Sequence, residues 1–301
     1  MLPEVRKFFN IRNPLFQFFL YLAFFVLIAH LDLLLFSKNS SDQLRFTIQL
    51  ITILITGILL YIVSVLKLNF RHANPLNILI SSMIVYILIH PTNPWIFFPL
   101  TIFFAWIGKY FIKYKNLPMF NPAGFGIFLT YYVTTFLQKI GVSNDVLLVS
   151  WWGADMQQYF LNEIPIFNMM VSLLLLFGFL YFIQKYNKHI LVSTFFVTFS
   201  IIFLLYNFFF HITFQESIKI LSMNMFTSFA FLMLIMIPEP KTSPNLSKHQ
   251  TVIGILGASV LFFLTWYLPD KSLFTPGLPF LTTLLTMNLF TVVLKEKKLL
   301  Q

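Results

Sequence analysis

Two carboxylates stand inside or at the end of long apolar runs, where an acidic side chain is costly to bury and is a candidate for function. Asp32 belongs to the apolar stretch Leu15–Phe36, and Glu239 directly follows a run that ends near Ile237. A carboxylate in such a place can bind a cation or pass a proton. Glu239 and Asp32 are therefore the candidates for an ion pathway. For Asp32, a position at the outer membrane interface is the alternative.

The sequence lacks the residues and motifs that several other kinds of functional site require. The sequence has no cysteine, which excludes disulfides, thiolate-held iron–sulfur clusters and cysteine nucleophiles. It has no G-x-G-x-x-G motif, so we predict no NADH site, and electrons would have to come from a partner. No E-x-x-H or H-x-x-x-H spacing occurs among the histidines, so we predict no metal site. These histidines are His30, His72, His90, His189, His211 and His249.

The stretch KNLPMFNPAGFGIFLT, Lys115–Thr130, places prolines, glycines and asparagines at the start of an apolar run. Proline is tolerated at a helix start, since the N–H that Pro122 lacks has no helical partner there. Gly124 and Gly126 permit close approach of another helix or of a flat ligand. Asn121 offers donors and acceptors beside an electropositive helix N-terminus. Two interpretations stay open, a site for an anionic or polar ligand and a capped, tightly packed helix.

The elements that must position these residues are membrane helices. Hydrophobic residues make up 58% of the chain, charged residues 10%, and the mean hydropathy is +0.82. Soluble domains are nearer one quarter charged. We predict an all-α polytopic membrane protein, one integral membrane domain over residues 1–301. The ten candidate spans are Leu15–Phe36, Phe46–Leu66, Asn74–Ile89, Trp95–Phe111, Phe120–Leu137, Ile166–Ile183, Ile190–Phe210, Ile220–Ile237, Val252–Leu268 and Gly277–Leu294.

The basic residues indicate the orientation of these spans. Five of the 20 lysines and arginines fall in one set of alternating loops, and the other fifteen fall in the second set and the termini. The five are Lys38, Arg45, Lys139, Lys219 and Lys271. The positive-inside rule then places both termini in the cytoplasm and the chain in the cell inner (plasma) membrane. The formal charge of +10 is thus explained by topology, and we expect no nucleic-acid partner. The first span is interpreted as an uncleaved anchor.

Two proline-bracketed turns suggest an internal repeat. VYILIHPTNPW, Val85–Trp95, and LMLIMIPEPKTSPN, Leu232–Asn245, each end an apolar run in a polar turn, about half the chain apart. With five spans in each half, the two turns face opposite sides of the membrane. We therefore predict two inverted five-helix repeats, about residues 15–137 and 166–294, which commonly frame a site near the membrane midplane. The alternative is that prolines merely end helices.

Three segments resemble the NqrB/RnfD family, whose members are membrane subunits of the sodium-pumping NADH:quinone reductase and of the Rnf electron-transport complex. The first segment is His90–Leu129, with a Pro-rich turn, the Gly108–Lys109 pair and the block Phe120-Asn121-Pro122-Ala123. The second is Phe231–Pro244, where Glu239 takes the place of the acid in the family's acid-Pro turn. The third is Phe280–Leu294, which resembles the family's last helix with its asparagine, here Asn288.

The resemblance implies a flavin, but its attachment motif is altered. The family links FMN through its phosphate to threonine in S-G-A-T, and this chain has SWWGADMQQYF, Ser150–Phe160, at that place. Gly153 and Ala154 match, whereas Asp155 replaces the threonine, and a carboxylate cannot form the phosphoester and repels the phosphate. We therefore expect a noncovalent flavin, FMN or riboflavin. Trp151 and Trp152 either stack on its ring or belong to the interfacial aromatic belt.

Three functions follow as hypotheses. The first is a membrane subunit of an Rnf/Nqr-like complex that binds flavin through Asn121, Pro122, Gly124, Trp151, Trp152, Gly153 and Asp155 and passes electrons to other subunits. The second is a solute transporter or channel, because the same ten-helix inverted-repeat architecture resembles urea transporters. The third is an accessory subunit without a cofactor.

Overall fold

The structure is a computed structural model that describes residues 10–36, 40–66, 74–149, 165–224, 228–267 and 278–297. Within these ranges the chain is mostly helical, as the composition predicts. In the first half the helices are α2 (Pro14–Phe36), α3 (Ser40–Leu66), α4 (Pro75–Leu88), α5 (Phe97–Tyr110) and α6 (Pro122–Lys139). In the second half they are α8 (Pro165–Lys185), α9 (His189–Phe209), α10 (Phe214–Asn224), α11 (Ser228–Phe231), α12 (Ser247–Phe262) and α13 (Leu278–Lys297).

Two π-helical segments continue helices of the second half. η1 (Leu232–Met236) follows α11 directly, and η2 (Phe263–Tyr267) follows α12 directly. A short antiparallel hairpin, β1 (Lys113–Tyr114) and β2 (Leu117–Pro118), joins α5 to α6. Its two turn residues, Lys115 and Asn116, have φ values of 48° and 64°. Both central residues of a two-residue hairpin turn of type I′ need such positive values.

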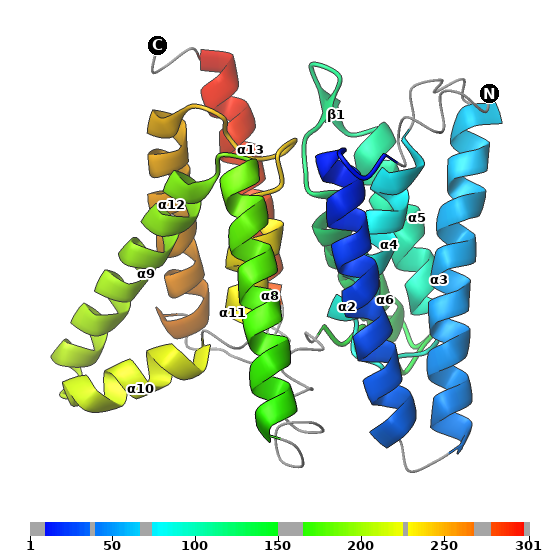
Figure 1. The fold of residues 1–301 in the computed structure, drawn as a ribbon, viewed down its shortest axis with the longest axis horizontal. Helices are drawn as coiled ribbons and strands as arrows, with labels where there is room; N and C mark the ends of the chain where they lie inside the picture. The colour runs from blue at the N-terminus through cyan, green and yellow to red at the C-terminus, as the bar shows by residue number, and fades with distance from the viewer. Residues whose placement is uncertain are drawn as a thin grey trace.

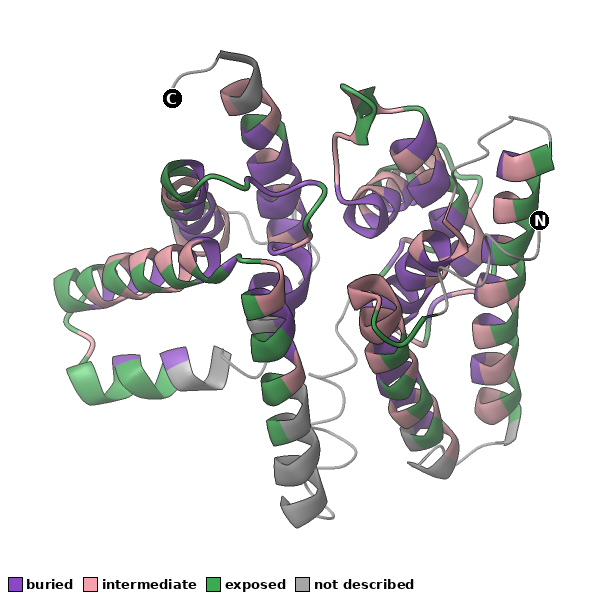
Figure 2. Cartoon of the chain, turned by 45° about the horizontal axis from the view of Figure 1, so that its top comes forward, coloured by how far each residue is buried: buried purple, intermediate pink, exposed green. Residues whose placement is uncertain are grey.

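Four of the described helical segments are long and apolar enough to cross a membrane: Pro14–Leu31, Ser41–Leu66, His189–Phe209 and Ser247–Trp266. Their outer faces are apolar as well. On α3 the exposed Ile51, Ile55, Ile58 and Ile62 recur at helical spacing, and Figure 2 shows exposed residues along the outside of the bundle with buried ones inside. A continuous apolar face of this kind is suited to lipid contact.

The predicted single span over Ile220–Ile237 is wrong. Its first residues belong to α10, which runs across the bundle, whereas Ser228–Met236 forms α11 and η1 beside α8 (Figure 1). The reason is the amphipathic character of α10. Ser217 and Leu221 are buried in it, while Gln215, Glu216 and Lys219 are exposed. Such a helix has one apolar face and one polar face, so it does not favour a position across lipid.

The two halves pack their helices in corresponding pairs. In the first half α3 contacts α4 and α5, α2 contacts α4, and α6 contacts α4 and α5. In the second half α9 contacts η1 and α12, α8 contacts η1, and α13 contacts η1 and α12. Between the halves, α6 packs on α13 and α2 packs on α8. Several helix pairs of the first half thus resemble pairs in the second half, although the contact between α4 and α5 has no equivalent of similar extent among the described residues there.

The bundle has two ends that differ in charge. α2 begins and α13 ends at the same end, uppermost in Figure 1, where the β1–β2 hairpin also lies. We call it the basic end, because Lys113, Lys115, Lys185, Lys241 and Lys248 belong to the turns and helix termini there. The opposite end has three acids among its described residues, Asp42, Asp145 and Glu216, and three basic residues, Arg45, Lys139 and Lys219, so it lacks the surplus of lysines.

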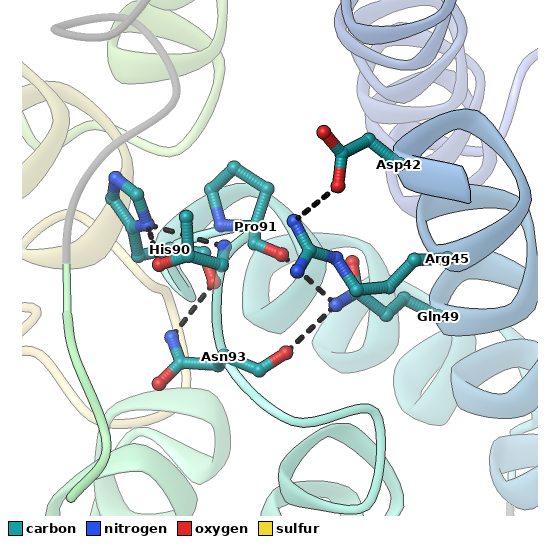
Figure 3. A network of polar contacts seen from close by, with 7 residues as sticks. Asp42, Arg45, Gln49, His90, Pro91 and Asn93 are labelled. Carbon is teal, nitrogen blue, oxygen red and sulfur yellow. Dashed lines mark hydrogen bonds and ion pairs between the residues drawn. The ribbon is translucent and has the colours of Figure 1, made fainter. Parts of the chain in front are cut away.

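The turn His90–Pro94 is fixed at the opposite end by amide hydrogen bonds (Figure 3). Asn93, which is buried, donates to the carbonyls of His90 and Leu148 at 2.7 and 2.8 Å and accepts the N–H of Leu148 at 2.9 Å. Gln49 of α3 donates to the carbonyls of Pro91 and Asn93 at 3.0 and 2.9 Å. These bonds satisfy backbone groups that the proline-rich turn leaves without helical partners. They give Asn93 and Gln49 structural roles.

Candidate functional site

A small cavity of about 70 Å³ lies at the basic end between the two halves. The first half contributes residues of α2, α4, α5 and α6, and the second half contributes residues of α8, η1 and the turn after η1. One wall is apolar and includes Leu15, Phe18, Ile80, Ile84, Phe182 and Leu234, with Tyr186 beside them. The polar lining consists of Asn77, Ser81, Lys109, Asn121, Glu239 and Lys241. Small-molecule sites commonly combine an apolar wall with a few polar groups of this kind.

Asn121 is held in place by two hydrogen bonds. It is the N-cap of α6, and its side-chain oxygen accepts the N–H of Gly124 at 2.9 Å. Its backbone N–H donates to Oδ1 of Asn288 in α13 at 2.8 Å. With the oxygen occupied by Gly124, the amide nitrogen is the group that can donate to the nearby Glu239 carboxylate, whose pKa it lowers. Asn121 therefore connects the first half of the chain to two separate segments of the second half.

Glu239 lies in the turn that follows η1, and its carboxylate is supported from both halves. Thr242 donates its hydroxyl to Oε2 at 3.0 Å, and Asn121 donates from the first half. Burial raises the pKa of the Glu239 carboxyl, while Lys109, Thr242, Lys241 and Asn121 act against this rise. The carboxyl therefore takes up a proton at a higher pH than an exposed glutamate, and its protonation would make the cavity more positive.

The turn that carries Glu239 is anchored by a fully buried lysine. Nζ of Lys188, at the start of α9, donates to the carbonyl of Pro244 at 2.7 Å and to Oδ1 of Asn245 at 2.8 Å. Gln250 of α12 donates to the carbonyls of Asn187 and Asn245 at 2.9 and 3.2 Å. Buried polar groups that are satisfied in this way rigidify their surroundings. The position of Glu239 is thus fixed relative to α8, α9 and α12.

The structure places the residues predicted from the sequence in three different settings. It brings Asn121, Pro122 and Glu239 together in the lining of the cavity. Gly124 packs instead between α13 and η1, since a Cβ there would lie 2.8 Å from Leu284 and 3.5 Å from Met236. Asp32 lies in α2 but far from the cavity, because the 14 residues from Phe18 to Asp32 span roughly 21 Å of helix axis.

Four other predicted flavin contacts, Trp151, Trp152, Gly153 and Asp155, lie outside the described residues. Sequence reasoning missed Lys109 and Lys241 as members of the site. Lys241 was interpreted as a topology signal, and Lys109 as a topology signal and as part of the Gly108–Lys109 pair that carries the family resemblance, but neither as a residue of the site. Asn77 was missed because its contact is with a residue far away in the sequence. Oδ1 of Asn77 accepts a hydrogen bond from Nζ of Lys241 at 3.4 Å.

Comparison with known proteins gives no assignment. No protein-family profile matches the sequence, and no curated protein matches it.

Proposed function

We propose that this protein is a membrane subunit of an Rnf/Nqr-like electron-transport complex that binds a flavin noncovalently and passes electrons to other subunits. One observation carries the proposal. The two motif stretches that resemble the NqrB/RnfD family, one with Lys109 and Asn121 and the other with Glu239, line the same cavity. They are far apart in sequence and come from different halves of the chain.

The proposed architecture is ten membrane segments in two inverted five-helix repeats. The corresponding helix pairs support it, since α2, α3, α5 and α6 match α8, α9, α12 and α13 by their neighbours. In this arrangement α11 and η1 match α4, and α6 and α13 meet as equivalent helices between the repeats. The eighth segment is then a short helix preceded by the transverse α10, comparable to the broken helices that frame sites in inverted-repeat proteins.

The proposed orientation has the basic end in the cytoplasm of the cell and both termini on that side. The positive-inside rule supports it, because lysines cluster at the end where α2 begins and α13 ends. We expect a reporter that is active only in the cytoplasm to be active when it is fused after Gln301. A reporter that works only outside the membrane is the matched test, and its activity at the same position would reject this orientation.

The chemical types of the residues that line the cavity support a flavin. The apolar wall formed by Phe18, Phe182 and Tyr186 suits the flat ring system, and Asn121 offers polar contacts beside it. The wall also excludes water from one side of a bound ring. A bound flavin would supply electron transfer, for which the side chains of this chain have no equivalent group.

We expect the purified protein to carry flavin that is released on denaturation. The native protein would absorb at roughly 450 nm, and the denatured chain on a gel would show no flavin fluorescence under ultraviolet light. The physical reason is Asp155, which stands where the family has the threonine that forms the phosphoester. Fluorescence that stays with the denatured chain would contradict noncovalent binding. Purified protein that lacks the absorbance and binds no added flavin would reject the proposed function.

One observation favours a second candidate, a solute transporter or channel similar to urea transporters. The cavity lies between the two halves at one end of the bundle, the position expected for a substrate vestibule in an inverted-repeat transporter. Uptake of labelled solute by vesicles that contain the protein, in a preparation without flavin, would favour this candidate. Bound flavin without uptake would favour the electron-transport subunit.

A further inference from the structure

The direction of α10 is fixed by the sequence around its first residue. Before it, His211 has a φ of 58°, the left-handed conformation that commonly follows the end of a helix, so α9 stops and the chain turns. Thr213 and Glu216 then form a capping box. The hydroxyl of Thr213 accepts the N–H of Glu216 at 3.2 Å, and Oε2 of Glu216 accepts the N–H and the hydroxyl of Thr213 at 3.3 and 2.9 Å. The turn from α9 into α10 is therefore built by local contacts.

A buried hydrogen bond holds α10 against α9 beyond this turn. Nδ2 of Asn207 in α9 donates to the hydroxyl of Ser217 at 3.1 Å, and this hydroxyl donates to the carbonyl of Thr213 at 3.0 Å. Asn207 and Ser217 are each 2% exposed, and a satisfied buried pair of this kind restrains the helices that carry it. α10 is thus fixed across the bundle at the end opposite to the basic end (Figure 1).

The side chains of α10 form an apolar arc and a polar arc. At about 100° per residue, the apolar arc consists of Ile220, Ser217, Leu221, Phe214 and Ile218 in that order, and the polar arc consists of Gln215, Lys219 and Glu216. Ser217 and Leu221, at the centre of the apolar arc, are buried. Its two flanks, Ile220 on one side and Phe214 with Ile218 on the other, are exposed. The bundle therefore covers only the middle of the apolar arc and leaves both flanks for another apolar partner.

The exposed flanks continue the apolar outer face of α9. On this helix, which is long and apolar enough to cross a membrane, Val197, Ile201 and Leu205 are exposed at helical spacing. The phenylalanines at residues 208–210 are exposed at its end. The 21 residues of α9 extend over about 31 Å, close to the hydrocarbon core of about 30 Å, so α10 begins near the boundary between acyl chains and headgroups. A bilayer that surrounds α9 therefore reaches the flanks of α10.

The polar arc indicates which kind of membrane surface α10 suits. Its two charges are those of Glu216 and Lys219, which cancel, and Gln215 is neutral. Interfacial helices that are attracted to anionic lipids carry polar faces rich in lysine and arginine. A polar arc without net charge gives no such attraction, so a zwitterionic phospholipid surface is sufficient.

We propose that α10 is an interfacial helix, which binds the phospholipid boundary layer of the leaflet opposite to the basic end and does so independently of lipid charge. The flanks Phe214, Ile218 and Ile220 lie among the acyl chains next to the headgroups, and the polar arc faces water. An interfacial helix buries its apolar face about 5–10 Å into the boundary between headgroups and acyl chains. This surface is separate from the cavity, so the inference holds for an electron-transport subunit and for a transporter alike.

Spin labels can measure the depth of α10, because the sequence contains no cysteine. The full chain would carry one labelled cysteine at a time in phosphatidylcholine vesicles, with oxygen as the lipid-soluble collision reagent and a nickel chelate as the water-soluble one. Labels at Phe214→Cys and Ile218→Cys are expected to collide more with oxygen than with the chelate. Labels at Gln215→Cys and Lys219→Cys are expected to show the reverse. The melting temperature in detergent checks that each labelled chain is folded.

Two reference labels calibrate these ratios. Ile201→Cys, on the exposed face of α9, should give the highest ratio of oxygen to chelate collisions, and Lys115→Cys, in the exposed hairpin turn, the lowest. Equal ratios at all four positions of α10 would place the helix wholly in water or wholly in lipid and would overturn the inference. Labels at residues 214 and 218 that neither reagent reaches would show that another protein or a second copy covers this face, which also overturns it.

A second set of vesicles tests the independence from lipid charge. Replacing part of the phosphatidylcholine by phosphatidylglycerol, which is anionic, should leave the ratios at all four positions unchanged. The reason is that Glu216 and Lys219 cancel on the polar arc. A shift toward oxygen at residues 214 and 218 in the anionic vesicles would overturn this part of the inference.

Discussion

Gly126→Leu is expected to abolish the folded protein, because α5 and α6 touch at this glycine. A Cβ on Gly126 would lie 2.5 Å from the carbonyl oxygen of Thr101 and 2.8 Å from the backbone nitrogen of Ala105. These are backbone atoms of α5, so no side-chain rotation can relieve the overlap. The helices would have to separate, which would also break the buried 3.0 Å hydrogen bond between Thr101 and Thr130.

The smaller change Gly126→Ala gives a measurable step. Overpacking in a well-packed interior costs about 1–3 kcal/mol and more where backbone must move, so we expect a loss of about 3 kcal/mol. The melting temperature and the monodisperse yield in detergent report both variants. Gly57→Ala is the control, since a Cβ there would meet at 2.6 Å only the hydroxyl of Ser82, which can rotate. A wild-type melting temperature for Gly126→Leu would show that α5 and α6 are not in close contact.

Asn121→Asp is expected to cause the second large loss of stability. Aspartate can still cap α6, because its carboxylate accepts the N–H of Gly124 as the amide does. It cannot donate to Glu239, however, and it places a second carboxylate beside the first. Two neighbouring carboxylates in a partly buried site repel each other, and one of them is forced to take up a proton. We expect a loss of about 3 kcal/mol or more at neutral pH, with partial recovery in acid as the pair shares a proton.

Two alanine variants separate the effect of helix capping from the effect of the contact between Asn121 and Glu239. Asn74→Ala removes only the cap of α4, where Asn74 accepts the N–H of Leu76 at 2.9 Å, and should cost about 1 kcal/mol. Asn121→Ala removes a cap and also leaves the Glu239 carboxylate without one of its donors, which adds about 1–3 kcal/mol. Thermal unfolding in detergent measures both. Equal losses for the two variants would show that the contact between Asn121 and Glu239 contributes nothing.

Hydropathy predicted most helices closely, because long apolar runs bounded by polar turns leave little choice. The predicted Leu15–Phe36 and Ile190–Phe210 differ by one residue at their boundaries from α2 and α9, which are Pro14–Phe36 and His189–Phe209. The failure over Ile220–Ile237 has a physical cause. A sliding average adds the apolar face of α10 to the apolar run of η1, and it cannot register that α10 has one polar face and runs across the bundle.

For the cavity, the sequence indicated individual residues but not which other side chains would lie beside them in the fold. Asn121 and Glu239 could be chosen because a capping amide before Pro122 and an acid at the end of an apolar run are unusual locally. Lys109 and Lys241 looked like ordinary loop lysines, because their roles depend on α5 and the turn after η1 meeting in space. Lys188 gave no signal at all, since its partners Pro244 and Asn245 are defined only by the fold.

The hydrogen bond from Asn121 to Asn288 has a consequence for biosynthesis. The N-terminus of α6 depends on a side chain of α13 that is made 167 residues later, and Gly124 packs on Leu284 of the same helix. Until α13 has been inserted, the N–H of Asn121 has no partner, which costs about 1–3 kcal/mol if the group is buried. Helices α2 to α6 therefore complete their packing only when translation has passed α13. A chain truncated before Leu278 would expose this unfinished surface within the membrane, where quality-control proteases can recognise it.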